Sequence, residues 1–140
     1  MLLQRLLERK IMDQSMYREQ MIELFRNPLN KGEIDSPTFT HEEDNPLCGD
    51  IVQIDVQMGD DGRVADVKWS GDGCAVSQVS ASLLTEEIQG MTMAQMQAID
   101  QDLILELLGI PLSMGRMKCA MLSLRVLQRG AARVNPVGDA

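Results

Sequence analysis

Three cysteines and one carboxylate are the residues of this chain whose types and surroundings could do chemistry. Cys48 and Cys74 each adjoin a glycine, and Asp50 follows Cys48 by two residues. Cys74 stands where a strand pattern gives way to a helical one, and the unpaired N–H groups of a helix N-terminus favour a thiolate. Cys119 falls early in another helical run, where we expect the same effect. Three thiolates and a carboxylate can complete a tetrahedral zinc site, and the thiolates can also hold an iron–sulfur cluster.

The spacing of the cysteines is by itself weak evidence for such a site. They lie 26 residues (48 to 74) and 45 residues (74 to 119) apart, so the chain has no Cys-x-x-Cys pair and is not a zinc ribbon or knuckle. The alternative is that all three are small buried hydrophobic residues, since free cysteine is among the most buried residue types. An odd number of cysteines in a reducing compartment favours metal binding or redox chemistry over disulfides.

A β-hairpin brings two of the cysteines together. Residues 51–58 alternate apolar and polar side chains, residues 59–62 have the composition of a turn, and residues 63–70 alternate again. Cys48 precedes the first strand and Cys74 follows the second. Antiparallel pairing of the strands therefore places both cysteines at the same end of the sheet.

Apolar residues at helical spacing predict a helix over residues 2–26, with a break near Ser15, which could cap a second helix. Asn27-Pro28 ends this run, because the residue before a proline is pushed away from helical angles. Residues 29–47 show no period, which predicts an irregular and mobile loop. His41 lies in this loop, where we expect a solvated side chain, with metal or substrate contact as the alternative.

The second half of the chain is mostly helical in pattern. The predicted helices cover residues 75–89 up to Gly90, a short segment opened by a Thr92–Gln95 capping box, a segment between Asp100 and Gly109, and residues 113–128.

Composition narrows the class of protein. The chain has 140 residues and a formal net charge of −8, so we expect one domain that binds no nucleic acid, which would require a clustered basic surface. No apolar run approaches the length of a membrane span, and residues 1–12 are too charged for a signal peptide, so we expect a cytoplasmic protein that does not enter a membrane. Eleven methionines and 3% aromatic residues predict a core of Met, Leu, Ile and Val.

Several motifs occur in a specific order along the chain. They are Tyr17-Arg18, Asn27-Pro28-Leu29-Asn30-Lys31-Gly32, Asn45-Pro46-Leu47-Cys48-Gly49-Asp50, Gly71-Asp72-Gly73-Cys74-Ala75-Val76-Ser77, Ser80-Ala81-Ser82 and Arg116-Met117-Lys118-Cys119-Ala120. A Cys-Gly-Asp, a Gly-x-Gly-Cys and a later helical cysteine form a specific combination. From about residue 16 to residue 128, the chain resembles the IscU/SufU/NifU N-terminal family of iron–sulfur cluster assembly proteins.

The resemblance implies an α+β fold, with a small antiparallel three-stranded sheet, helices packed on one face and the metal site at the sheet end. The family fold adds a third strand to the hairpin, from the segment before Cys48. We expect a single domain over residues 1–140, in which residues 1–12 form an N-terminal helical extension and residues 133–140 a flexible tail.

Within the family, the chain is more similar to the SufU branch. Members of the IscU type carry histidine directly before the third cysteine, where this chain has Lys118, a cation that would favour the Cys119 thiolate. The IscU-type Leu-Pro-Pro-Val-Lys segment, which a dedicated chaperone reads, is also absent. The separation of 45 residues from Cys74 to Cys119 nevertheless leaves no room for the insertion that typical SufU members have.

The resemblance to SufU implies a zinc-binding sulfur acceptor that takes persulfide sulfur from a SufS-like cysteine desulfurase and serves iron–sulfur apoproteins or the Suf assembly complex. Zinc would be held by Cys48, Asp50, Cys74 and Cys119. Cys48 is our choice for the catalytic sulfur acceptor, because it borders the predicted loop and can leave the metal with the least backbone movement. Arg116 and Lys118 are candidates for contacts that tune the thiolates or meet the partner.

Two other functions remain open. The resemblance to IscU implies a scaffold that assembles and transfers a [2Fe–2S] cluster on the same four residues, with Asp50 as the weak ligand that makes the cluster labile. The third possibility is a zinc ion that only holds the loop, the hairpin and the last helix together. We expect a sulfurtransferase-like acceptor or a scaffold rather than a classical turnover enzyme.

Overall fold

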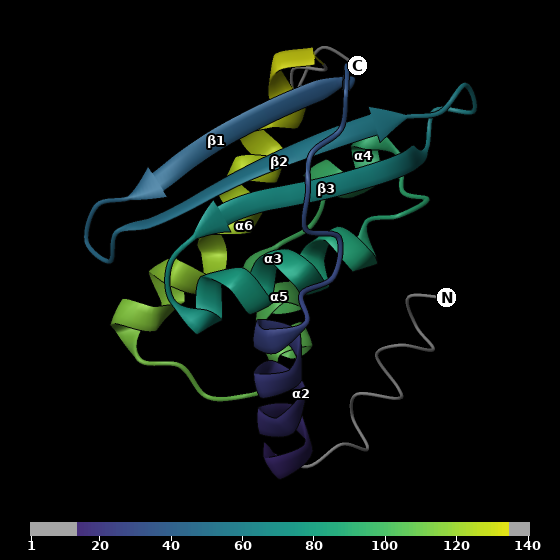
Figure 1. The fold of residues 1–140 in the computed structure, drawn as a ribbon. Coiled ribbons are helices and arrows are strands. Elements are labelled where there is room, and N and C mark those ends of the chain that lie inside the picture. Colours follow the sequence, from purple (N-terminus) through teal and green to yellow (C-terminus); the bar gives the residue numbers. More distant parts are fainter. Residues whose placement is uncertain (1–13, 135–140) are drawn as a thin grey trace.

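The structure is a computed structural model, and it describes residues 14–134. The elements of this part of the chain are α2 (Gln14–Arg26), β1 (Phe39–Asn45), β2 (Asp50–Met58), β3 (Val64–Asp72), α3 (Ala75–Glu87), α4 (Met93–Gln97), α5 (Gln101–Leu108) and α6 (Met114–Val134). The strands form one antiparallel sheet in the order β1-β2-β3 (Figure 1). The expected α+β fold with a three-stranded sheet is confirmed.

The predicted hairpin is present as β2 and β3. Its register pairs Ile54 with Trp69 at the centre and Ile51 with Asp72 at one end. Gly62 closes the connecting turn with a φ of 77°, which favours glycine. The residues just before β2 and just after β3 therefore lie at the same end of the sheet, as the sequence predicted.

The expectation of an irregular loop over residues 29–47 is wrong for its second half. Residues 39–45 form β1, which pairs with β2 from Phe39↔Val56 to Asn45↔Asp50. This strand is the third strand that the resemblance placed before Cys48. Its sequence, Phe-Thr-His-Glu-Glu-Asp-Asn, lacks apolar alternation because its inward side chains include His41 and Glu43. Glu43 pairs with two arginines of α6, and His41 bonds Glu43 and is only 15% exposed, so the expectation of a solvated His41 is wrong.

Helices cover one face of the sheet. In Figure 1, α6 runs behind β1 and β2, while α3 lies beneath β2 and β3. The core between these layers is mostly aliphatic, with Trp69 and Phe39 as its aromatic members, as the composition predicted. Its largest fully buried side chains include Trp69, Ile54, Leu84, Ile88, Met96, Leu122 and Leu127.

The helix ends are set largely by the predicted residues. Thr92 and Gln95 form the expected capping box of α4, Asp100 caps α5 through the Leu103 N–H, and Gly109 ends α5 in the left-handed region. Two predictions were wrong at the ends of other helices: Ser15 lies within α2 and does not cap it, and α6 continues past residue 128 to Val134.

The predicted tail over residues 133–140 is wrong at its start, because Arg133 and Val134 belong to α6. The rest of that tail and the predicted helical extension over residues 1–12 lie outside the described residues. Within residues 14–134, no helix combines the length and the apolar character needed to cross a bilayer.

Candidate metal centre

Cys48 lies in the tight turn between β1 and β2. Asn45, the last residue of β1, is buried, and its carbonyl oxygen accepts the N–H of Cys48 at 3.2 Å and of Gly49 at 2.8 Å. Its side-chain Oδ1 also accepts the Leu47 N–H at 3.2 Å. Gly49 has a φ of 71°, so the turn is built on a residue that reaches this region without strain. The Cys48 side chain is thereby held at the sheet end and is exposed.

Asp50 is the first residue of β2, and its side chain is entirely buried. Oδ1 accepts the backbone N–H of Cys74 at 2.8 Å, and Oδ2 accepts the Cys74 thiol at 3.5 Å. Gly73 makes room for this carboxylate: a Cβ at that position would collide with Oδ1 of Asp50. The N-cap residue of α3, Cys74, is thus tied directly to the start of β2.

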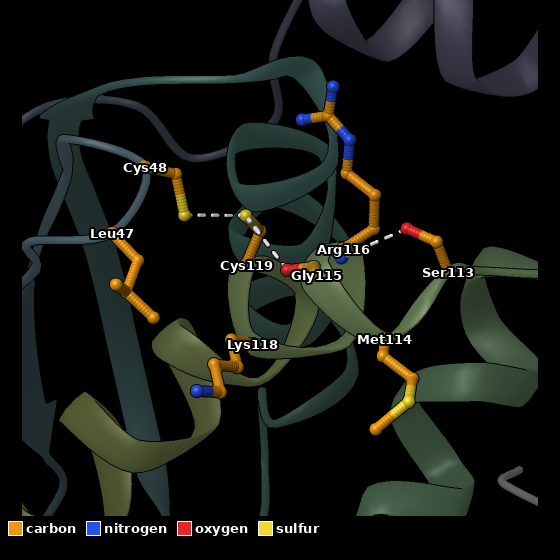
Figure 2. A pocket seen from close by; sticks show the side chains of 8 residues that line it. All are labelled: Leu47, Cys48, Ser113, Met114, Gly115, Arg116, Lys118 and Cys119. Carbon is orange, nitrogen blue, oxygen red and sulfur yellow. Dashed lines mark hydrogen bonds between the residues drawn. The ribbon is translucent and has the colours of Figure 1, made fainter.

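Cys119 completes the cluster from the other side. It lies early in α6, is buried, and its Sγ is 2.9 Å from the Sγ of Cys48 (Figure 2). The ligand atoms of Cys48, Asp50 and Cys119 all lie within 4.8 Å of one another. Cys74 adjoins this trio through its contact with Asp50. The structure therefore groups three of the four predicted ligands within 4.8 Å and places the fourth, Cys74, beside Asp50, although they come from three separate stretches of sequence.

Two pKa shifts describe the electrostatics of the cluster in the absence of a metal. Burial raises the pKa of Asp50, but hydrogen bonds from the Cys74 N–H and from the thiols of the three cysteines outweigh it and leave the pKa below its ordinary value. Burial also raises the pKa of Cys119, and its contacts with Cys48 and Asp50 raise it further. The expectation that the helix position alone would favour the Cys119 thiolate is therefore wrong, because desolvation of a buried thiolate dominates.

Of the two predicted neighbouring cations, Arg116 interacts with the thiols. Its guanidinium has a raised pKa, chiefly through the negative charge that Cys74 and Cys119 carry when ionised. Lys118 is exposed, and its side chain points away from the two sulfurs in Figure 2.

An open cleft of about 510 Å³ gives access to Cys48 and Cys119. Leu47 and Met114 form an apolar rim and are 76% and 89% exposed. Sequence reasoning missed these two residues and the role of Asn45. An Asn-Pro pair before Cys48 was the available signal for Asn45, since asparagine side chains commonly bond the backbone two residues on. The cleft is lined by Leu47, Cys48, Ser113, Met114, Gly115, Arg116, Lys118 and Cys119.

The residues present fit a zinc ion. Three sulfurs and one carboxylate are a donor set that zinc prefers, and the space left by Gly73 lets the carboxylate turn into the cluster. Two thiolates on one zinc lie about 3.8 Å apart, given a Zn–S distance of about 2.3 Å. The Cys48 sulfur would have to withdraw from Cys119 by about 1 Å, which a rotation of this exposed side chain can supply.

The model of the NifU-like N-terminal domain family matches residues 16–135 of the chain. The chain belongs to this family. One relative, the zinc-dependent sulfurtransferase SufU of Bacillus subtilis, is 31% identical over 136 residues, which cover 85% of this chain and 91% of the relative. The iron–sulfur cluster assembly scaffold protein IscU 1 of Archaeoglobus fulgidus is 32% identical over 114 residues, covering 81% of this chain and 73% of the relative.

A solved structure shares the fold of this NifU-like domain. It is a protein from Fervidobacterium islandicum AW-1 described as an iron–sulfur cluster assembly scaffold for the SUF system. The two structures superpose with a TM-score of 0.69 at 23% identity, over 79% of this chain and 93% of the other. The resemblance that the motifs indicated is thus confirmed at the level of family and fold.

Proposed function

We propose that this NifU-like domain is a zinc-binding sulfur acceptor in iron–sulfur cluster assembly. The observation that carries the proposal is the pairing of an exposed Cys48 with a buried Cys119 and a buried Asp50, all with ligand atoms within 4.8 Å. An exposed thiol can meet a partner, while the buried members can keep a metal in place. The name of the Bacillus subtilis relative, a zinc-dependent sulfurtransferase, supports the same function.

Cys48, Asp50, Cys74 and Cys119 are the residues that would hold the zinc ion. When bound, zinc keeps its cysteine ligands deprotonated at neutral pH and adds directly to folding stability. Asp50 is already disposed toward this role, because its hydrogen bonds keep its pKa low despite complete burial. Zinc would change the protonation of Cys119 the most, since burial otherwise keeps this thiol protonated.

Cys48 is the proposed acceptor because its side chain is the exposed one of the three and lies on a turn, whereas Cys74 caps α3 and Cys119 is buried in α6. The Cys48 thiolate attacks the outer sulfur of a persulfide on a cysteine desulfurase. A new S–S bond forms on Cys48, the S–S bond of the donor breaks, and the donor cysteine leaves as a thiolate. The product is a Cys48 persulfide, and the two electrons of the broken bond stay with the donor.

Arg116 and Lys118 are proposed to assist at the surface of the cleft. The charge of Arg116 interacts with the thiolates of Cys74 and Cys119, so this cation favours their ionised forms. Lys118 points outward from the same cleft and is better placed to meet the partner. We further propose a cytoplasmic, SufS-like desulfurase as donor, and iron–sulfur apoproteins or a Suf assembly complex as recipients.

A second candidate function is a scaffold for a [2Fe–2S] cluster, which would then be the cargo of the protein. Asp50 supports the scaffold function, because one hard oxygen ligand among soft sulfurs weakens the binding of a cluster and allows the cluster to be released. The scaffold names of the Archaeoglobus relatives agree with this candidate.

The metal and sulfide content of the protein, purified without oxygen, distinguishes the two functions. The acceptor function predicts about one zinc per chain, no acid-labile sulfide, and uptake of sulfur when a cysteine desulfurase and cysteine are added. Iron with sulfide, or a zinc form that takes no sulfur but builds a cluster once the zinc is removed, would establish the scaffold. A zinc form that does neither would leave only the structural role.

A further inference from the structure

A cluster of charged side chains joins the edge strand β1 to α6, away from the cysteines. The Glu43 carboxylate accepts three hydrogen bonds: from His41 Nε2 at 2.8 Å, from Arg125 Nε at 3.0 Å and from Arg129 Nη1 at 2.7 Å. The side chains of His41 and Glu43 are only 15% and 16% exposed. Burial raises the pKa of Glu43, but these partners outweigh it and hold the pKa below its ordinary value. Glu43 therefore carries its charge between two elements.

The closest pair of cysteines lies next to β1 and on α6. Two residues after Glu43, Asn45 forms the turn that holds Cys48. On α6, Arg125 lies six residues after Cys119. A single ion-paired carboxylate thus connects the strand that ends at the Cys48 turn with the helix that bears Cys119.

Another close contact of β1 with α6 lies nearer the start of the strand. A Cβ on Gly130 of α6 would come within 2.9 Å of His41 Cβ and of Phe39 Cδ1, so strand and helix touch closely there. Between this contact and the buried Asn45, Glu43 is the inward-facing residue of the strand. Apolar packing fixes the start of β1, and ion pairs fix the part that leads into the Cys48 turn.

We propose that Glu43 is a positioning residue: through Arg125 and Arg129, it holds the Cys48 turn at the distance from Cys119 that the shared site requires. Charge-assisted hydrogen bonds are directional as well as strong, so they set the position of the strand end along α6. Loss of the charge leaves β1 paired with β2 but lets its end and the Cys48 turn shift relative to the helix. The inference deepens the proposed function, since it concerns the same two cysteines.

Thiol bridging tests this geometry without metal, sulfur donor or cluster. Dibromobimane becomes fluorescent when it links two nearby thiols, so its rate of fluorescence gain reports how often Cys48 and Cys119 lie close together. The measurement uses the full chain with Cys74→Ser, treated with chelator, well below its melting temperature. We expect Glu43→Gln to slow the bridging roughly fivefold, while the total number of reactive thiols in the unfolded protein stays the same.

Glu42→Gln is the matched control, because Glu42 is the neighbouring residue of β1 and is exposed on the opposite face. We expect it to bridge at the unsubstituted rate. A role in stability alone would lower the melting temperature of Glu43→Gln without changing the bridging rate of the folded protein. Equal rates for Glu43→Gln and Glu42→Gln would therefore overturn the proposal.

If Glu43→Gln does not fold, Arg129→Gln replaces it, since the Arg129 side chain is 63% exposed and its loss spares the interior. The proposal then predicts slower bridging for Arg129→Gln, and an unchanged rate overturns it. The outcome is independent of the proposed function, because a chain that never accepts sulfur would still give this bridging result.

Discussion

Two carboxylates, Asp50 and Glu43, are both shielded from solvent, but different kinds of partner stabilise their charge. Each is largely or fully buried, and in each the surroundings lower the pKa against the effect of burial. Asp50 is held by a backbone N–H and by thiols, which are neutral when protonated. Glu43 is held by two arginines, which are always charged, and by His41.

The difference lies in whether the partners can be exchanged. Thiols that lose a proton become metal ligands, so the surroundings of Asp50 can change from hydrogen-bond donors to a shared coordination shell. The arginines beside Glu43 have no second form and no alternative chemistry. The cysteines around Asp50 can therefore exchange protons for a metal, whereas the arginines around Glu43 hold β1 against α6. The strand β1 and the turn after it connect the two clusters.

The largest effect is expected from removing the charge of Asp50. Asp50→Asn should weaken zinc binding by more than about 100-fold, because a ligand is lost and the amide stays buried among thiols. The loss exceeds that expected for a residue that only bonds to a ligand. Competition with a chromophoric chelator measures the affinity. Asp44→Asn, an exposed carboxylate of β1 near the same end of the sheet, should bind zinc as tightly as the unsubstituted chain. Equal affinities for the two variants would remove Asp50 from the site.

Adding a methyl group beside Asp50 should also be costly. In Gly73→Ala, the new Cβ meets Asp50 Oδ1 at a residue whose φ is 148°, so we expect the free energy of unfolding to fall by about 3 kcal/mol. Gly62→Ala has a φ of 77° but open space around the new Cβ, and should lose only about 1 kcal/mol. Chemical denaturation measures both. Similar losses would mean that backbone strain alone accounts for Gly73, without crowding at Asp50.

Two glycines of α6 test the contact that fixes the start of β1. Gly130→Ala should lower the free energy of unfolding by about 2 kcal/mol, because its Cβ crowds Phe39 and His41. Gly115→Ala meets nothing within 4 Å and should be neutral or stabilising by up to about 1 kcal/mol, as alanine is the better helix former. Thermal melting ranks the two variants, and a stabilised Gly130→Ala would show that β1 does not rest closely on α6.

The smallest effect is expected at Glu43, and it depends on pH. Because its folded pKa is depressed, the Glu43 charge stabilises the fold above its ordinary pKa of 4.5, and this stability is lost as the pH falls through the lower folded value. Glu43→Gln should therefore be less stable than the unsubstituted chain by about 1 kcal/mol at pH 7. The difference should shrink below pH 4.5. A difference that stays constant down to the acid limit would argue against an ionised Glu43 in the fold.

The sequence predicted the part of the site that rests on local pattern. Alternating side chains and a glycine-rich turn define the β2–β3 hairpin, and the hairpin alone places Cys48, Asp50 and Cys74 at one end of the sheet. Cys119 lies 45 residues further along the chain than Cys74, so only the family resemblance placed it there.

β1 shows why the rest was not predictable. Its inward residue Glu43 pairs with two arginines on a distant helix and with His41 beside it, and a pattern of hydrophobic residues cannot report such pairs. The pKa of Cys119 was mispredicted for a related reason. Neighbouring elements bury the thiol, and this burial raises its pKa more than the helix N-terminus lowers it. In both cases, tertiary partners decide a property that local sequence rules assign from near neighbours.

The position of the transferred sulfur tests the central claim most directly. The zinc-loaded chain is incubated with a cysteine desulfurase and cysteine, its thiols are alkylated, and peptide mass spectrometry locates the added sulfur. The account predicts a persulfide on Cys48, and none anywhere on the chain in Cys48→Ala. A persulfide on Cys74 or Cys119, or full sulfur uptake by Cys48→Ala, would contradict it.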